Sequence, residues 1–166
     1  MAVDTGILAR QLGEALQARG MMMTTAESCT GGGIAAAITD IAGSSAWFDR
    51  GFVTYSNAAK TDMLGVDPAL IERHGAVSRE VAEAMVRGAC AASGCGLGVA
   101  VTGVAGPGGG SPEKPVGTVW LACCLAAHDR LDCRLLQLDG DRAAVRRQTV
   151  MHALRACLGL LEQHPT

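Results

Sequence analysis

Helical patterns and short apolar runs alternate along this chain, and this alternation is typical of helices packed on a sheet. Between residues 4 and 19, for example, Leu8, Leu12 and Leu16 recur at helical spacing. The predicted helices are 4–19, 34–41, a short helix carrying Lys60, 78–93 and a last helix that begins after Asp141; the predicted strands are 21–26, 51–55, 97–102, 116–125 and 131–138.

The order of these elements predicts a mixed sheet covered by helices. The last two strands are separated only by a polar turn around residues 128–130, which indicates an antiparallel hairpin added to an otherwise crossover-connected sheet. The chain has 166 residues, of which 49% are hydrophobic and 18% charged, so we expect one globular domain spanning residues 1–166.

Composition excludes several classes of function. The net charge is −2 and the arginines are scattered, so we expect no nucleic-acid partner. We also expect no membrane partner, because no apolar run is long enough to cross a bilayer. The seven cysteines contain no C-x-x-C pair, and H-E-x-x-H is absent. We therefore predict a cytoplasmic protein with reduced thiols that uses no metal and no cofactor.

Three glycine-rich or polar loops follow predicted strands, at residues 27–33, 55–60 and 102–111. In open sheets of this kind, ligands bind at the carboxyl ends of the strands. We therefore expect these three loops to converge on one crevice.

Ser28 and Thr30 lie where a strand gives way to a helix. A hydroxyl there would meet free backbone N–H groups and the positive end of the helix dipole, which stabilise a developing oxyanion or a phosphate. The alternative interpretation is that one of these hydroxyls caps the helix and the following glycines only make the turn.

Only two of the fourteen basic residues are lysines, Lys60 and Lys114, and both lie in or beside these loops. A lysine desolvated in a cleft has a lowered pKa and can activate a serine, so Lys60 is the candidate base, with Tyr55 as proton relay or orienting group. The alternative is a solvated lysine and a tyrosine at the edge of the core. A Ser-His-Asp triad is disfavoured, since no histidine falls in the three loops.

The run 103–110 lacks the Lys-Ser/Thr ending of a Walker loop. Its N–H groups either cradle a monophosphate or form a rigid surface turn. Arg142 either clamps a phosphate or pairs with Asp141 or Asp139.

Together these motifs resemble the family of the C-terminal domain of the competence/damage-inducible protein CinA, over nearly the whole chain. The matching segments are Thr25-Ala26-Glu27-Ser28-Cys29-Thr30-Gly31-Gly32, Trp47-Phe48-Asp49-Arg50-Gly51-Phe52-Val53-Thr54-Tyr55-Ser56-Asn57, Lys60, His74-Gly75-Ala76-Val77-Ser78, Thr102-Gly103-Val104-Ala105-Gly106-Pro107, Lys114-Pro115-Val116-Gly117-Thr118-Val119 and Gly140-Asp141-Arg142.

The resemblance implies a three-layer α/β/α sandwich with a mixed, mostly parallel sheet. It also implies an amidohydrolase that converts nicotinamide mononucleotide to nicotinate mononucleotide and ammonia, recycling pyridine nucleotide for NAD synthesis, and a homodimer. The implied catalytic residues are Ser28, Tyr55 and Lys60, and the implied substrate-binding residues are Thr30, Gly31, Gly32, Thr102, Gly103, Gly106 and Arg142.

Several alternatives stay open at this point. The N–H groups around Thr30 and Gly31 would bind either the oxyanion or the substrate phosphate. The nucleophile would be Cys29 if its thiol were activated by the helix N-terminus, or a water molecule if no acyl-enzyme forms. A noncatalytic nucleotide-binding or interaction module, linked to competence or DNA damage, is the rival function.

Overall fold

The structure is a computed structural model that describes residues 4–165. Five strands form one sheet in the order β2-β1-β3-β4-β5. The parallel pairs are β2 with β1 and β1 with β3, and the antiparallel pairs are β3 with β4 and β4 with β5. The strand bounds are β1 Met23–Glu27, β2 Phe48–Val53, β3 Leu97–Gly103, β4 Thr118–Leu125 and β5 Arg130–Gln137.

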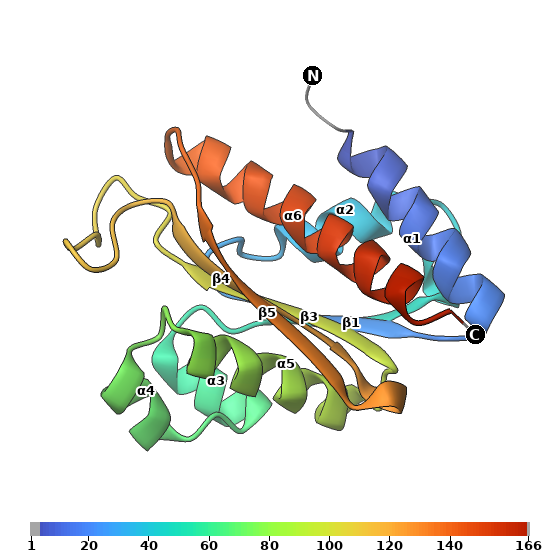
Figure 1. Cartoon of the computed structure of the whole chain (residues 1–166), viewed down its shortest axis with the longest axis horizontal. Helices are drawn as coiled ribbons and strands as arrows, with labels where there is room; N and C mark the ends of the chain where they lie inside the picture. Colours follow the sequence, from blue (N-terminus) through green and yellow to red (C-terminus); the bar gives the residue numbers. More distant parts are fainter. Residues whose placement is uncertain (1–3, 166) are drawn as a thin grey trace.

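Helices cover both faces of this sheet, so the predicted α/β/α sandwich is confirmed (Figure 1). One layer holds α1 (Thr5–Arg19), α2 (Gly33–Thr39) and α6 (Arg142–Gln163), and the other holds α3 (Asn57–Leu64), α4 (Pro68–His74) and α5 (Arg79–Ser93). Two short 3₁₀ turns, Ser44–Ala46 and Ala126–His128, complete the described elements.

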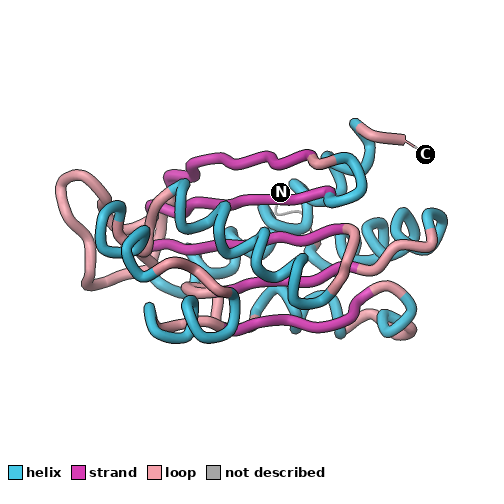
Figure 2. Tube along the Cα trace, turned by 90° about the horizontal axis from the view of Figure 1, so that it is seen from below, coloured by secondary structure: helices cyan, strands magenta, loops and turns pink. Residues whose placement is uncertain are grey.

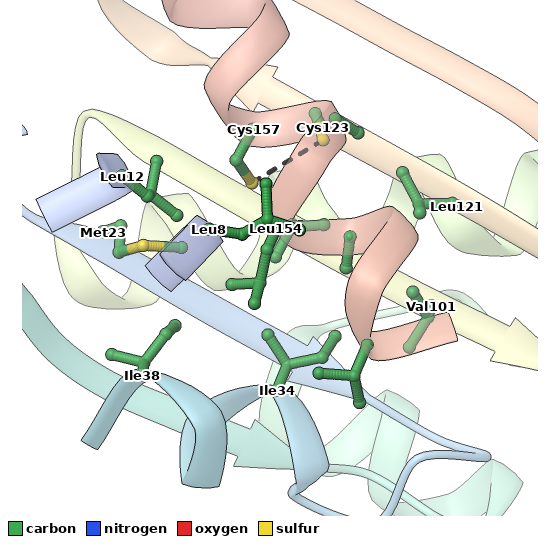
Figure 3. Close-up of a cluster of buried hydrophobic side chains, with 14 of the residues drawn as sticks. Leu8, Leu12, Met23, Ile34, Ile38, Val101, Leu121, Cys123, Leu154 and Cys157 are labelled. Atoms are coloured by element: carbon green, nitrogen blue, oxygen red, sulfur yellow. Dashed lines mark hydrogen bonds between the residues drawn. The ribbon is translucent and has the colours of Figure 1, made fainter. Parts of the chain in front are cut away.

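The core on the α1, α2 and α6 side is built almost entirely from aliphatic side chains (Figure 3). Leu8 of α1, Ile34 of α2 and Leu154 of α6 are buried in one cluster with Val101 and Leu121 of the sheet. The cluster also contains three cysteines, Cys29, Cys123 and Cys157, and the Sγ atoms of Cys123 and Cys157 are 3.8 Å apart. Burial of this apolar surface fixes the three helices on the sheet.

The core on the other side is narrower and depends on small residues. Val81 and Met85 of α5 pack in a cluster with Ala100 and Ala122 of the sheet. A Cβ at Gly88 would lie 2.0 Å from the carbonyl oxygen of Leu64, so glycine is required where α5 crosses the end of α3. The alanine- and glycine-rich composition therefore permits close approach of backbones on this side.

The predicted helix starts at Ser78 and Asp141 are confirmed. Each side chain accepts a hydrogen bond from a backbone N–H in the first turn, from Val81 and from Ala144 respectively.

Most element ends differ from the predictions by one or two residues, and two differences are larger. Pro68 was predicted to open a turn, but it is the first residue of α4, and Asp67 caps this helix. Proline suits the first helical position because the N–H that it lacks would have no partner within the helix. Strand β2 covers 48–53 rather than 51–55, since its pairing with β1 ends at Glu27 and Val53. Tyr55 consequently lies in a loop.

The parallel strands β1, β2 and β3 all end at the same edge of the sheet. The long loop between β3 and β4 extends beyond this end of the sheet, as Figure 1 (yellow) and Figure 2 (pink) show. This edge therefore brings together the three loops that the sequence singled out.

Candidate active site

Ser28 is the first residue after β1 and is almost fully buried, with 8% of its surface exposed. Its N–H donates to the carbonyl of Val101, which extends the pairing with β3 by one residue. The chain then turns: the N–H of Gly31 donates to the carbonyl of Ser28, and Gly31 and Gly32 have φ of 57° and 101°. These positive φ values favour glycine, so the sequence after Ser28 forces a sharp turn directly behind its hydroxyl.

Glu27 occupies the start of α2, a role that the sequence reasoning missed. Its buried carboxylate accepts hydrogen bonds from the N–H groups of Ile34 (2.8 Å) and Ala35 (3.0 Å) and from the hydroxyl of Thr30. The helix N-terminus is thus neutralised internally. The expectation of free N–H groups for a substrate anion at this helix start is therefore wrong.

Lys60 lies directly beside Ser28, with Nζ 3.1 Å from Oγ. It is only 1% exposed, so the alternative of a solvated lysine is wrong. Ser56 caps α3, and Lys60, one turn into that helix, reaches back to the carbonyl oxygens that precede it. Its Nζ donates to Thr54 (2.9 Å), Tyr55 (3.3 Å) and Ser56 (3.4 Å).

The surroundings of Lys60 suit a base. Burial lowers the pKa of Lys60 below its ordinary value, because the charged form loses solvation. Its four described hydrogen-bond partners are oxygen atoms without formal charge. A neutral amine is therefore accessible, and once it takes a proton, three carbonyl dipoles already face the ammonium.

Cys29 does not have the properties of a nucleophile. Burial raises the pKa of its thiol to about 11, with the nearby Glu27 carboxylate adding to the effect. A thiol with this pKa stays protonated near neutral pH, whereas a catalytic cysteine needs an accessible thiolate. The raised pKa of the Cys29 thiol therefore favours Ser28 as the nucleophile.

Tyr55 and Arg142 meet across the mouth of the cleft. The guanidinium of Arg142 donates to the Tyr55 hydroxyl (3.1 Å) and to the carbonyl of Gly106 (2.7 Å). The Asp141 carboxylate instead caps α6. Pairing of Arg142 with Asp141 or Asp139, one of the two interpretations that the sequence left open, is therefore not what the structure shows. The Tyr55 side chain is 60% exposed, and only its backbone carbonyl contacts Lys60.

A cleft of about 300 Å³ opens over Ser28 and Lys60. Seven of the ten predicted site residues line it: Ser28, Tyr55, Lys60, Thr102, Gly103, Gly106 and Arg142. Thr30, Gly31 and Gly32 are not among the lining residues, because they shape the turn behind Ser28 instead.

Residues 76–77 form a wall of the cleft that the sequence reasoning did not assign. The Thr102 hydroxyl donates to the carbonyl of Ala76 (2.9 Å), and Lys114 donates to the carbonyl of His74 (2.9 Å). These bonds tie the segment after α4 to the end of β3 and to the glycine-rich loop. The His74–Ser78 motif was the only sequence signal for this wall.

Arg146 is a further residue that the sequence did not single out. It extends from α6 to the turn behind the serine, where Nε donates to the carbonyl of Cys29 (3.1 Å) and Nη2 to that of Thr30 (3.0 Å). It does not line the cleft.

Metal-binding clusters and membrane-spanning helices are both absent from the described residues. Residues 4–165 contain no group of three His, Cys, Asp or Glu side chains that could hold a metal ion. Within the same range, no helix has the length and apolar character needed to span a membrane.

Comparison with known proteins gives consistent matches. A model of the CinA C-terminal domain matches residues 6–161. The nicotinamide-nucleotide amidohydrolase PncC of Pseudomonas putida is 62% identical over 153 residues, covering 92% of this chain and 94% of the relative. The protein of the same name from Escherichia coli K12 is 55% identical over 148 residues, covering 89% of both chains. The crystal structure of competence/damage-inducible protein CihA from Agrobacterium tumefaciens has a TM-score of 0.93 at 48% identity, covering 96% of this chain and 97% of that one.

Proposed function

This chain belongs to the CinA C-terminal domain family, and we propose that it is a nicotinamide-nucleotide amidohydrolase that converts nicotinamide mononucleotide to nicotinate mononucleotide and ammonia. The observation that carries this proposal is the 3.1 Å contact between Ser28 Oγ and Lys60 Nζ at the base of the cleft. Such a pair supplies a nucleophile and its base in one contact. Relatives named for this activity match the chain over nearly its full length.

In the first step, Ser28 Oγ attacks the carbon of the substrate carboxamide and its proton passes to Lys60 Nζ. The resulting ammonium remains bound to the carbonyl oxygens of residues 54–56, so the proton is held beside the reacting centre. The carboxamide oxygen becomes the oxyanion of a tetrahedral intermediate. Cys29 is the residue of this turn, after Ser28, that lines the cleft, so we assign its backbone N–H as donor to the oxyanion.

In the second step the carbon–nitrogen bond breaks, and Lys60 returns the proton to the leaving nitrogen, which departs as ammonia. Water then attacks the acyl-serine ester, giving its proton to Lys60, and nicotinate mononucleotide leaves as Ser28 regains its proton. The direct contact of the two side chains makes Tyr55 unnecessary as a relay, and we assign it to orienting Arg142.

The substrate phosphate binds at the other end of the cleft. Arg142 is the arginine of the lining, and Gly106, Gly108 and Gly109 present backbone there without side chains. A guanidinium and glycine N–H groups are a common phosphate-binding combination. Thr102 and Gly103, at the end of β3, also line this cleft.

We also propose the setting in which this reaction occurs. Residues 1–166 act as one catalytic domain, in the cytoplasm and as a homodimer, and the reaction returns pyridine nucleotide to NAD synthesis. All seven cysteines lie in the described part of the chain and none is in a disulfide, which suits a reducing compartment. Leu135, on the edge strand β5, is an exposed apolar side chain available for contact with a second copy. Sedimentation equilibrium tests the dimer, and a monomer mass would exclude it.

Ser28 and Lys60 supply both nucleophile and base, so the proposed reaction needs no metal and no organic cofactor. Turnover after dialysis against EDTA should equal turnover before it. A loss that added metal restores would contradict this part of the proposal.

Ammonia release from nicotinamide mononucleotide by the purified protein is the test. The wild type and Cys29→Ala should both turn over, whereas Ser28→Ala should retain almost no activity. Failure of the wild type to release ammonia, with nucleotide binding intact, would instead support the rival of a noncatalytic nucleotide-binding module. Trapping of an acyl-serine in a single turnover distinguishes covalent catalysis from direct attack by water.

A further inference from the structure

The turn that carries the nucleophile is bound from behind by a side chain that is distant in the sequence. Arg146 lies 117 residues from Cys29 and 116 from Thr30, yet its guanidinium donates to the carbonyl oxygens of both. These two carbonyls belong to consecutive peptide groups, starting one residue after Ser28. Through Arg146, helix α6 therefore fixes the direction of the backbone immediately after the nucleophile.

The two hydrogen bonds also determine where the N–H groups of this turn point. The peptide bonds here are trans, and in a trans peptide the carbonyl and the N–H point in opposite directions. With the Cys29 carbonyl held toward α6, the N–H of Thr30, in the same peptide group, points away from α6. With the Thr30 carbonyl held likewise, the N–H of Gly31 is oriented to bond the carbonyl of Ser28.

We propose that Arg146 is a positioning residue for the amidohydrolase reaction: its guanidinium aligns the Cys29–Thr30 backbone, and through it the hydroxyl of Ser28, whose own carbonyl receives the Gly31 N–H. This inference rests on the proposed function. Arg146 does not line the cleft, so it acts through the turn and not on the substrate.

The arrangement of α6 supports this division of roles. Arg142 and Arg146 are four residues apart and so share one face of the helix. Arg142 contacts Gly106 and Tyr55 at the cleft mouth, while Arg146 contacts only the turn behind the serine. One rigid helix thus sets the position of the substrate clamp relative to the nucleophile.

The geometry also explains why the residue is an arginine. Two acceptors in neighbouring peptide groups require two donors held at a fixed separation, which the planar guanidinium provides. A lysine ammonium at the same place keeps the charge, but its three N–H donors share one nitrogen and are not held in a plane at a fixed separation. Arg146→Lys therefore tests the positive charge without the guanidinium geometry, whereas Arg146→Ala removes both.

The experiment compares Arg146→Ala and Arg146→Lys with Arg147→Ala, a matched control because Arg147 is the exposed neighbour on the same helix. For Arg146→Ala we expect kcat to fall about 100-fold with KM nearly unchanged, as for misplacement of a reacting group. Arg146→Lys should recover part of kcat, and Arg147→Ala should match the wild type. The pH at which activity rises should not move, because Lys60 keeps its surroundings.

The result that overturns the proposal is a folded Arg146→Ala enzyme with kcat within about threefold of the wild type, or one that changes KM alone. Melting temperatures establish that each variant is folded; if Arg146→Ala is not, the kcat of Arg146→Lys decides, and a wild-type value there also overturns the proposal. An inactive wild type would instead refute the proposed function, so the two failures are distinguishable.

Discussion

Lys60 Nζ and Ser28 Oγ lie 3.1 Å apart in the protein interior, although 32 positions separate the two residues in the sequence. Both side chains are buried, and the lysine is surrounded by backbone carbonyls. The lysine is therefore placed to accept the serine proton when substrate fills the cleft.

Replacement of this base should nearly abolish turnover. For Lys60→Met, which keeps the length and removes the amine, we expect kcat to fall by about 10²–10⁴, the usual contribution of a general base. Steady-state ammonia release measures the loss. Arg10→Met is the control, because Arg10 is a long basic side chain exposed on α1 that does not line the cleft. Equal losses in both variants would argue against a specific base.

The lowered pKa of Lys60 should affect the pH dependence of both the free energy of unfolding and the activity. Between its pKa in the folded protein and the ordinary value of 10.5, the unfolded chain binds more protons at this residue, so the free energy of unfolding should rise with pH across that window. Activity should rise as the amine loses its proton, at a pH below 10.5. Urea unfolding at several pH values measures how the free energy of unfolding depends on pH. Lys60→Met should remove the contribution of this residue to that dependence. If the free energy of unfolding of Lys60→Met rose with pH as steeply as that of the wild type, the assignment of this effect to Lys60 would be wrong.

Loss of Arg142 should weaken binding more than chemistry. We expect Arg142→Ala to raise KM for nicotinamide mononucleotide about 10- to 100-fold, the value of a charge-assisted hydrogen bond to phosphate. Nicotinamide riboside lacks the phosphate, so its kcat/KM should change little. An equal loss for both substrates would place Arg142 elsewhere in the mechanism.

Tyr55→Phe distinguishes an orienting role from a proton relay. The hydroxyl contacts Arg142, so its removal should raise KM by a few-fold and leave kcat near the wild type. In an Arg142→Ala background the same substitution should add almost nothing, because the two residues act on one contact. A fall in kcat as large as that of Lys60→Met would instead indicate a relay.

Glu27 should contribute to stability through the start of α2. Its carboxylate accepts three hydrogen bonds, and Glu27→Gln turns an NH₂ group toward donors, so we expect a loss of about 2–3 kcal/mol. Urea unfolding measures the change. Glu14→Gln is the control, because Glu14 is exposed on α1, and it should unfold like the wild type. Equal stability of the two variants would show that the buried cap contributes nothing.

Two glycine-to-alanine substitutions should shift stability in opposite directions. Gly88→Ala places a methyl group against the Leu64 carbonyl and should destabilise by about 1–3 kcal/mol. Gly159 lies within α6, where a methyl group would meet no atom within 4 Å, so Gly159→Ala should stabilise by about 0.5–1 kcal/mol through helix propensity. Thermal unfolding compares the two. Stabilisation by Gly88→Ala would contradict the packing of α5 on α3, and destabilisation by Gly159→Ala would contradict the open space beside that residue of α6.

Local signals predicted much of the fold correctly. The strand at 97–102 and the helix starts at Ser78 and Asp141 were identified, because apolar periodicity and capping act within a few residues. The helix α4 was missed, because proline is common both in turns and at the first position of a helix, where Pro68 lies. The sequence indicated which three loops form the candidate site, but it did not indicate which side chains in them contact one another.

The sequence by itself determined the helix-covered sheet, the sharp turn after Ser28 and the candidate status of Ser28 and Lys60. Only the tertiary structure decided that Lys60 is buried against Ser28, that Glu27 occupies the start of α2 and that Arg142 and Arg146 serve different parts of one site. Periodicity, caps and turns are interactions between near neighbours in the chain. The site contacts join residues up to 117 positions apart, and they exist only once the sheet order and the two helix layers bring those residues together.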